Sequence, residues 1–347
     1  MIITRTPFRI TLGGGGTDLP AYYRRHGGFI FAAALNKYMF VCLNTPIVDD
    51  LIRVKYSESE IVADVDQVRH TLARQALRQF HLRNGVEIIS MADVPAGTGL
   101  GSSSCYLVGL LNGLHTLCRK PVTRQELAEE ACHIELDLLQ KPIGKQDQYM
   151  AAFGGLTVME IDRDGRVEVQ EAGLSPDVVE ELESNILLFY TGQSRSTEEI
   201  LGPQTRRLAD QEEQITNNLH LIQEIGREIL AQLRQGRTRR FGELLDDHWQ
   251  AKKRLSDDVT GRRINHLYEV ARANGAIGGK ISGAGGGGFF LLYAEEGKKQ
   301  LRAAMEAEGL REMRFRFDLE GSKVLMDFLS GEQYRALHAR MATVIHA

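Results

Sequence analysis

Three glycine-rich segments contain the residues of this sequence whose types and spacing could do chemistry. They are RITLGGGGTDLP at 9–20, PAGTGLGSSSC at 95–105 and KISGAGGGGFF at 280–290. Glycine lets the backbone approach a ligand closely, and a helix start presents unpaired N–H groups with partial positive charge. The second segment holds three glycines and three serines within eight residues, which favours a binding site for an anion such as phosphate. The alternative is a tight turn in which Ser102 or Ser103 caps the following helix.

The common nucleotide-binding and hydrolase motifs are incomplete in these segments. A Walker A loop needs Ser or Thr after its Gly-Lys pair, whereas Lys145 is followed by Gln146 and Lys280 by Ile281. GTGLGS lacks the last glycine of the GxGxxG dinucleotide fingerprint, and the serines do not fit the GxSxG elbow of hydrolases. An anion site here must therefore be of another type.

The elements around these segments can be predicted from hydrophobic periodicity. VEIISMADV, a strand pattern, precedes the second segment, and an apolar helix follows it, so this region is predicted to be strand, loop and buried helix. Thr123 and Glu126 form a capping box that starts a helix, which Pro142 and Gly144 end; Glu135 falls beside its core face. The late glycine segment is predicted to be strand, loop and strand. Together these elements favour an α+β fold with domains at 1–175 and 176–347.

Composition excludes several classes of function. The chain has 347 residues, 43% of them hydrophobic, and a formal net charge of -4 without a basic block that could follow a nucleic acid. No apolar run reaches the length of a membrane span, and the N-terminus is not typical of a signal peptide, so we expect a cytoplasmic protein that binds neither membranes nor nucleic acids. A homodimer is left open.

Together the three segments resemble the signature motifs of the GHMP kinases, the superfamily of galactokinase and mevalonate kinase. PAGTGLGSSSC is similar to the P-x-x-x-G-L-G-S-S-A phosphate loop of that family, and KISGAGGGG to its late K-x-[ST]-G-A-G-x-G-G loop. The resemblance covers most of the chain. It implies a two-domain α+β GHMP kinase fold, in which the N-terminal domain is like ribosomal protein S5 domain 2 and the C-terminal domain is ferredoxin-like.

The same resemblance implies ATP and Mg²⁺ as cofactors. In the family the phosphate loop surrounds the phosphates with backbone N–H groups, while a serine and a glutamate hold magnesium, which implies these roles for Ser103 and Glu135. The residues alone favour an ordinary exposed helix glutamate at Glu135. The residues implied in nucleotide binding are Pro95, Gly97, Gly99, Leu100, Gly101, Ser102, Ser103 and Ser104.

The segment KPIGKQDQYMAAFGG at 141–155 resembles the stretch that supplies the catalytic aspartate of the family. Asp147 is the implied base, and Arg9 the residue that stabilises charge at the reacting centre. Lys145 lies two residues away and would face the same side on a strand, where its charge could keep Asp147 ionised. The alternatives are a turn or cap role for Asp147 and an exposed strand position for Arg9.

The first and third segments also resemble the sugar-binding parts of the family. The residues implied in acceptor binding are Arg9, Gly15, Gly16, Thr17, Asp18, Gly283, Ala284 and Gly285. Asp18 could instead cap a short helix.

GGGGTD, IGKQDQY and YTGQSRST at 190–197 resemble the heptose 7-phosphate kinases, with L-fucose kinases as near relatives. This implies phosphorylation of the C1 hydroxyl to a heptose 1,7-bisphosphate, for activated heptose in lipopolysaccharide or capsule synthesis. A free-sugar kinase and a non-catalytic sensor are the alternatives. The acceptor phosphate needs a cation, and Arg195 is the first candidate, ahead of Arg24–Arg25–His26 and Lys145.

Overall fold

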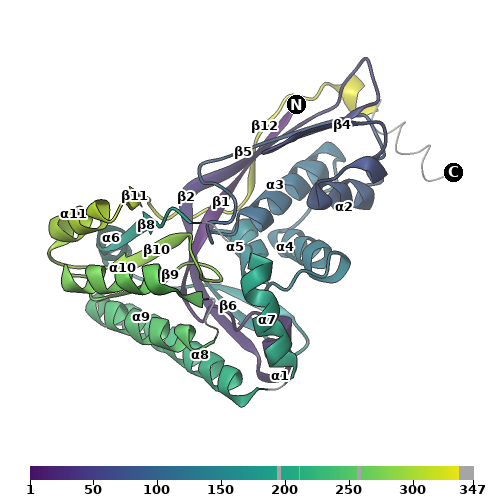
Figure 1. Cartoon of the computed structure of the whole chain (residues 1–347). Coiled ribbons are helices and arrows are strands. Elements are labelled where there is room, and N and C mark those ends of the chain that lie inside the picture. Colours follow the sequence, from purple (N-terminus) through teal and green to yellow (C-terminus); the bar gives the residue numbers. More distant parts are fainter. Residues whose placement is uncertain (194–196, 211, 256–258, 336–347) are drawn as a thin grey trace.

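The computed structural model describes residues 1–193, 197–210, 212–255 and 259–335 (Figure 1). Within these ranges the strands form one eight-stranded and one four-stranded sheet, and helices pack against both. The expected α+β fold is therefore confirmed. The described helices include none that is long and apolar enough to cross a membrane.

The large sheet is built around two long antiparallel strands. Its hydrogen-bonded order is β12-β1-β2-β5-β3-β4, and β6 pairs with β2 and β7. The bounds are β1 Ile2–Gly13, β2 Gly28–Asn44, β3 Ile52–Lys55, β4 Ser59–Val62, β5 Val86–Ala92, β6 Leu156–Ile161, β7 Val167–Glu171 and β12 Lys323–Asp327. β12 comes from the C-terminal part of the chain and pairs with β1, with Asp327 opposite Ile2. The domain boundary at 175/176 stays a prediction.

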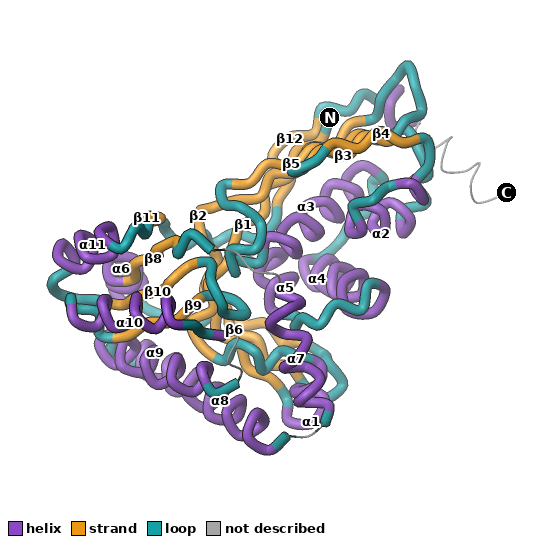
Figure 2. Tube along the Cα trace, viewed as in Figure 1, coloured by secondary structure: helices purple, strands orange, loops and turns teal. Residues whose placement is uncertain are grey.

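Helices cover one face of this sheet, as Figure 2 shows for α2, α3 and α4. The bounds are α1 Pro20–His26, η1 Val65–Gln67, α2 Thr71–Gln79, α3 Ser102–Leu117, α4 Arg124–Cys132, η2 His133–Leu138 and α5 Gln146–Phe153. The capping box of Thr123 and Glu126 is present at the start of α4, as the sequence predicts. After Cys132 the chain continues as a π-helical turn, η2, which carries Glu135. Such single-turn π segments are frequent at functional sites.

The small sheet and its helices come from the second half of the chain. Its order is β11-β8-β10-β9, with β8 Ile186–Tyr190, β9 Gly278–Ile281, β10 Phe289–Tyr293 and β11 Arg311–Met313. The helices are α6 Pro176–Asn185, α7 Thr197–Ala209, α8 Glu213–Arg234, α9 Thr238–Lys253, α10 Arg262–Ala273 and α11 Lys298–Ala307. Trp249 on α9 is fully buried against Phe290 and Tyr268.

The two halves of the chain meet at several very close contacts, one of which joins β1 and α8. A Cβ atom on Gly13 of β1 would lie 2.7 Å from Cα of Gly226 on α8. Such a distance leaves no room for a side chain, so the two glycines let α8 lie directly on β1 and β2. This contact fixes the second half of the chain against the strand that carries Arg9.

Candidate active site

A cavity of about 820 Å³ lies where the three glycine-rich segments meet. Its walls come from β1, the loop before α3, the loop before α5, α9 and β9. Most of the residues that the sequence analysis selected line it: Arg9, Gly15, Gly16, Asp18, Pro95, Gly97, Gly99, Gly101, Ser102, Ser103, Ser104, Glu135, Asp147, Gly283 and Ala284. Residues from distant parts of the sequence are thus brought to one site.

The loop at 95–101 leads directly into the start of α3, so the predicted strand, loop and helix are confirmed. A Cβ on Gly99, where φ is +78°, would lie 2.5 Å from the carbonyl oxygen of Ser282, and one on Gly283 would lie 2.7 Å from Cα of Gly99. Only glycine fits this left-handed, crowded position. The phosphate loop and the late glycine loop therefore support each other.

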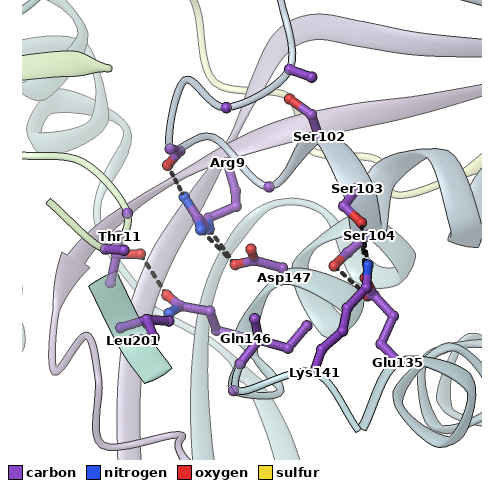
Figure 3. Close-up of a pocket in the computed structure, with 18 of the residues that line it drawn as sticks. Arg9, Thr11, Ser102, Ser103, Ser104, Glu135, Lys141, Gln146, Asp147 and Leu201 are labelled. Atoms are coloured by element: carbon purple, nitrogen blue, oxygen red, sulfur yellow. Dashed lines mark hydrogen bonds and ion pairs between the residues drawn. The ribbon is translucent and has the colours of Figure 1, made fainter. Parts of the chain in front are cut away.

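Asp147 is fixed by an arginine that reaches it from β1 (Figure 3). Nε of Arg9 lies 2.7 Å and Nη2 2.5 Å from Oδ1 of Asp147, while Nη1 donates to the carbonyl of Gly99 at 2.7 Å. The arginine side chain is 3% exposed and the aspartate side chain 25%. A buried guanidinium thus ties the carboxylate to the phosphate loop and leaves the aspartate open to the cavity.

Glu135 is the centre of a second polar cluster, and it is fully buried (Figure 3). Its carboxylate accepts hydrogen bonds from Ser103 Oγ at 2.9 Å, Ser104 Oγ at 2.6 Å and Gln148 Nε2 at 2.7 Å. Lys141 Nζ lies 3.0 Å from both Ser103 Oγ and Glu135 Oε1. The exposed-helix alternative for Glu135 is therefore wrong.

This second cluster offers the kind of ligands that magnesium takes. The Ser103 hydroxyl and the Glu135 carboxylate are hard oxygen donors 2.9 Å apart, and the ammonium of Lys141 already balances charge beside them. The described residues hold no group of three or more His, Cys, Asp or Glu side chains suited to a metal. A magnesium ion here would accordingly take most of its ligands from phosphate oxygens and water.

Asp18 also lines the cavity and is buried. It accepts hydrogen bonds from the backbone N–H of Gln146 at 3.0 Å and of Gly16 at 3.2 Å. Burial raises the pKa of Asp18, and the charge of Asp147 adds to this rise. Thr11 Oγ1 donates to Oε1 of the same Gln146 side chain at 2.6 Å. Polar groups from β1 and from the start of α5 thus converge on the same wall.

Lys145 does not lie beside Asp147, so the expected strand geometry is wrong. Residues 146–153 form α5, in which neighbours two apart point in different directions. Lys145 precedes this helix, and its Nζ contacts both carboxylate oxygens of Glu129 at 3.0 Å and the carbonyl of Gly165 at 2.7 Å. It therefore has partners outside the cavity.

Other selected residues also lie outside the cavity lining. Thr17 is buried and its hydroxyl bonds the backbone of Gly14 and Phe29, which closes the first glycine loop. Leu100 is buried and Gly285 packs on Val259. Arg24–Arg25–His26 form the exposed end of α1. Arg195 lies outside the described residues.

Five basic cavity residues were missed by the sequence analysis. These are His70, Lys141, His248, Lys252 and Lys280. A signal existed for two of them, because His248 and Lys252 are four apart on α9 and share one helix face. A single sequence does not distinguish buried lysines from surface lysines, so it gave no signal for Lys141 or Lys280.

Comparison with known proteins agrees with this geometry. The GHMP kinases N terminal domain model matches residues 67–155, and the GHMP kinases C terminal model matches residues 229–310. The chain belongs to the GHMP kinases. Kinases of this family use ATP, so the chain is an enzyme that transfers a phosphoryl group, and the non-catalytic alternative is set aside.

The kinase is similar to proteins of several specificities. It is 29% identical to a D-glycero-alpha-D-manno-heptose 7-phosphate kinase from Campylobacter jejuni, over 93% of this chain and 98% of that protein. A D-glycero-D-manno-heptose 1-phosphate kinase structure from Bacteroides thetaiotaomicron superposes with a TM-score of 0.78 and 25% identity, covering 95% of this chain and all of the other. A mevalonate kinase from Pyrococcus abyssi is 27% identical over 78% of this chain and 80% of its own length.

Proposed function

We propose that this kinase transfers the γ-phosphoryl group of ATP to the C1 hydroxyl of D-glycero-D-manno-heptose 7-phosphate. The product is the 1,7-bisphosphate, an intermediate of activated heptose synthesis. The observation that carries the proposal is the contact of Arg9 with both Asp147 and the phosphate loop. The similarity to a heptose 7-phosphate kinase over 93% of this chain supports the acceptor.

Asp147 acts as the base. Arg9 contacts Oδ1, so Oδ2 takes the proton of the C1 hydroxyl as the sugar oxygen bonds to the γ-phosphorus. The bond from that phosphorus to the bridging oxygen breaks at the same time, and ADP leaves with the electron pair. A positioned base contributes about 10²–10⁴-fold to such a step. Arg9 stabilises the charge that develops between donor and acceptor.

The nucleotide phosphates bind at the start of α3. Its unpaired backbone N–H groups and the partial positive charge of the helix suit an anion. Ser103 and Glu135 would hold Mg²⁺, which neutralises charge on the β- and γ-phosphates when bound. Lys141 supplies a further positive charge beside them. On the opposite wall, Asp18 and Gln146 would bind sugar hydroxyls.

The test is ADP release from Mg-ATP with heptose 7-phosphate, mannose 6-phosphate, L-fucose, galactose and mannose at equal concentrations. The proposal predicts a strong preference for the heptose phosphate. A preference for L-fucose would contradict it and support the second candidate, which a specific similarity favours. A bifunctional fucokinase from Arabidopsis thaliana is 23% identical over 86% of this chain, although the chain spans only 30% of that protein.

A further inference from the structure

Three basic side chains line the wall of the cavity that α9 and β9 form. His248 and Lys252 come from α9 and Lys280 from β9, and they are 1%, 8% and 2% exposed. Buried lysines are rare unless they are paired, because removing an ammonium group from water is costly. The grouping therefore calls for a ligand or for a compensating carboxylate.

Four carboxylates that line the cavity already have partners, among them Asp93, which accepts from the backbone N–H of Tyr38. Asp147 pairs with Arg9, and Glu135 pairs with Lys141. Asp18 accepts from the backbone of Gln146, and Glu198, which also lines the cavity, is exposed.

In the part of the chain that the structure describes, no ion pair joins Lys252 or Lys280 to a carboxylate. Lys252 Nζ donates to the carbonyls of Ile281, at 3.3 Å, and of Gly283. Both ring nitrogens of His248 are buried without a hydrogen-bond partner among the described residues. Lys252 and Lys280 thus line the cavity without a carboxylate partner among the described residues, and the buried ring of His248 keeps both nitrogens unpaired.

The charges repel one another in the absence of a ligand. Burial lowers the pKa of Lys252 to about 7, with a further contribution from Arg9. Burial and the neighbouring Lys252 hold the pKa of Lys280 well below its usual value, and the pKa of His248 is lowered for the same kind of reason. A bound dianion would reverse each of these penalties.

We propose that His248, Lys252 and Lys280 form a binding pocket for a phosphate monoester, and that it is the phosphate which the acceptor sugar already carries. This inference rests on the proposed function, because it names the group that recognises the acceptor. The acceptor is favoured over the γ-phosphate by position. The nucleotide features, which are Ser103, Glu135 and Lys141, lie on α3, on η2 and just after η2, whereas the pocket comes from α9 and β9.

The pocket also supplies basic side chains for the acceptor phosphate, for which the sequence analysis had considered Arg195, Arg24–Arg25–His26 and Lys145. Lys145 contacts Glu129 outside the cavity, and Arg24–Arg25–His26 lie on an exposed helix end. Arg9 and the three basic side chains line the same cavity, and the charge of Arg9 adds to the effect of burial in lowering the pKa of Lys252.

The binding test uses Trp249, the only tryptophan of the sequence, which follows His248 on α9. Its fluorescence is recorded without ATP while heptose 7-phosphate, dephosphorylated heptose or inorganic phosphate is added. We expect the phosphorylated sugar to bind more tightly than the free sugar. Lys280→Met should weaken its binding about 10–100-fold, the usual worth of a charged hydrogen bond.

Two variants separate the role of charge from a structural role. Lys280→Arg keeps the charge and should restore most of the affinity, whereas Lys55→Met removes an exposed lysine that pairs with Glu87 and should change nothing. Thermal unfolding of each variant checks the fold. ADP and ATP affinities should stay unchanged in Lys280→Met.

The outcomes are distinguishable. Equal binding of heptose 7-phosphate by wild type and Lys280→Met would overturn the pocket, and loss of ATP affinity instead would assign it to the γ-phosphate and overturn the acceptor claim. If another sugar phosphate binds best and Lys280→Met still abolishes its binding, the proposed heptose substrate fails while the pocket stands.

Discussion

Among the described residues, the basic side chain at the phosphate-loop end of the cavity has a carboxylate partner, whereas those at the end formed by α9 and β9 have none. At the phosphate loop, Lys141 lies 3.0 Å from Glu135, and that carboxylate also accepts hydrogen bonds from two serines and a glutamine. At α9 and β9, Lys252 and Lys280 have no carboxylate partner among the described residues, and His248 has unused ring nitrogens. At the phosphate-loop end, here called the paired end, the charges balance without a ligand. At the α9 and β9 end, here called the unpaired end, the positive charges are balanced only when an anion binds.

This difference indicates a division of labour. A paired cluster of hydroxyl, carboxylate and ammonium groups suits a metal-bound nucleotide, whose own charge is largely neutralised. An unpaired cationic cluster suits a phosphate without a metal. In the proposed mechanism, Asp147 and Arg9 act where the γ-phosphoryl group passes from one ligand to the other.

The largest effect is expected from Asp147→Asn, which removes the base and leaves both ends intact. Turnover should fall about 10²–10⁴-fold, because the C1 hydroxyl loses its proton acceptor. Steady-state ADP release measures this loss. Affinities for ATP and for the sugar phosphate, measured separately by fluorescence, should stay close to wild type. Unchanged turnover would show that Asp147 is not the base.

Glu135→Gln should break the paired end alone. It removes the charge that balances Lys141 and one oxygen ligand for Mg²⁺, so turnover at a fixed Mg²⁺ concentration should fall about 100-fold, equivalent to about 2.7 kcal/mol. Titration with Mg²⁺ should show a higher half-saturating concentration. Glu129→Gln is the control, because that carboxylate pairs with Lys145 outside the cavity. The same Mg²⁺ dependence in wild type and Glu135→Gln would exclude this metal role.

The affinity for the acceptor should depend on pH because of the unpaired end. Burial lowers the pKa of Lys252 to about 7 in the free kinase, and the charge of Arg9 adds to this effect. A bound phosphate raises this pKa, so the affinity for a sugar phosphate should decrease as pH rises above 7, by up to about tenfold per unit. Binding of the dephosphorylated sugar should not follow this trend. Lys252→Arg, which stays charged, should flatten the profile, and an identical profile in this variant would contradict the assignment.

The smallest effect concerns the contact that joins the loops of the two ends. Gly99→Ala places a Cβ 2.5 Å from the carbonyl of Ser282, and such overpacking should lower the free energy of unfolding by about 1–3 kcal/mol. Gly192→Ala is the matched control, since Gly192 also has positive φ but nothing lies within 4 Å of its Cβ position. Denaturant unfolding of both variants measures the difference. Equal losses would mean that backbone strain alone explains the effect.

Local patterns predicted much of this structure. The capping box at Thr123 and the strand and loop before α3 follow from short-range rules, whereas the role of Glu135 was implied only by the family resemblance and its burial by no local pattern. The prediction of a strand at Lys145 was wrong for a physical reason. A short polar segment after a glycine fits a strand or a helix equally well, and tertiary packing stabilises the helix α5 here.

The positions of the basic side chains in the cavity could not be predicted from local sequence patterns. Lys280 on β9 meets α9 only through the fold of the small sheet, so its burial depends on long-range packing. Lys141 follows the π-helical turn η2. Its backbone N–H donates to the carbonyl of Glu135 at 2.9 Å, which holds the two residues together. Periodicity based on 3.6 residues per turn does not predict such a turn.

The most direct test of the central claim is the position of the new phosphate in the product. Heptose 7-phosphate, Mg-ATP and the wild-type kinase are incubated together, and the product is examined by phosphorus NMR. The account predicts one new phosphate coupled to the anomeric proton, with the original phosphate unchanged at C7. A phosphate on another hydroxyl, or no product from this sugar while L-fucose is phosphorylated, would contradict it.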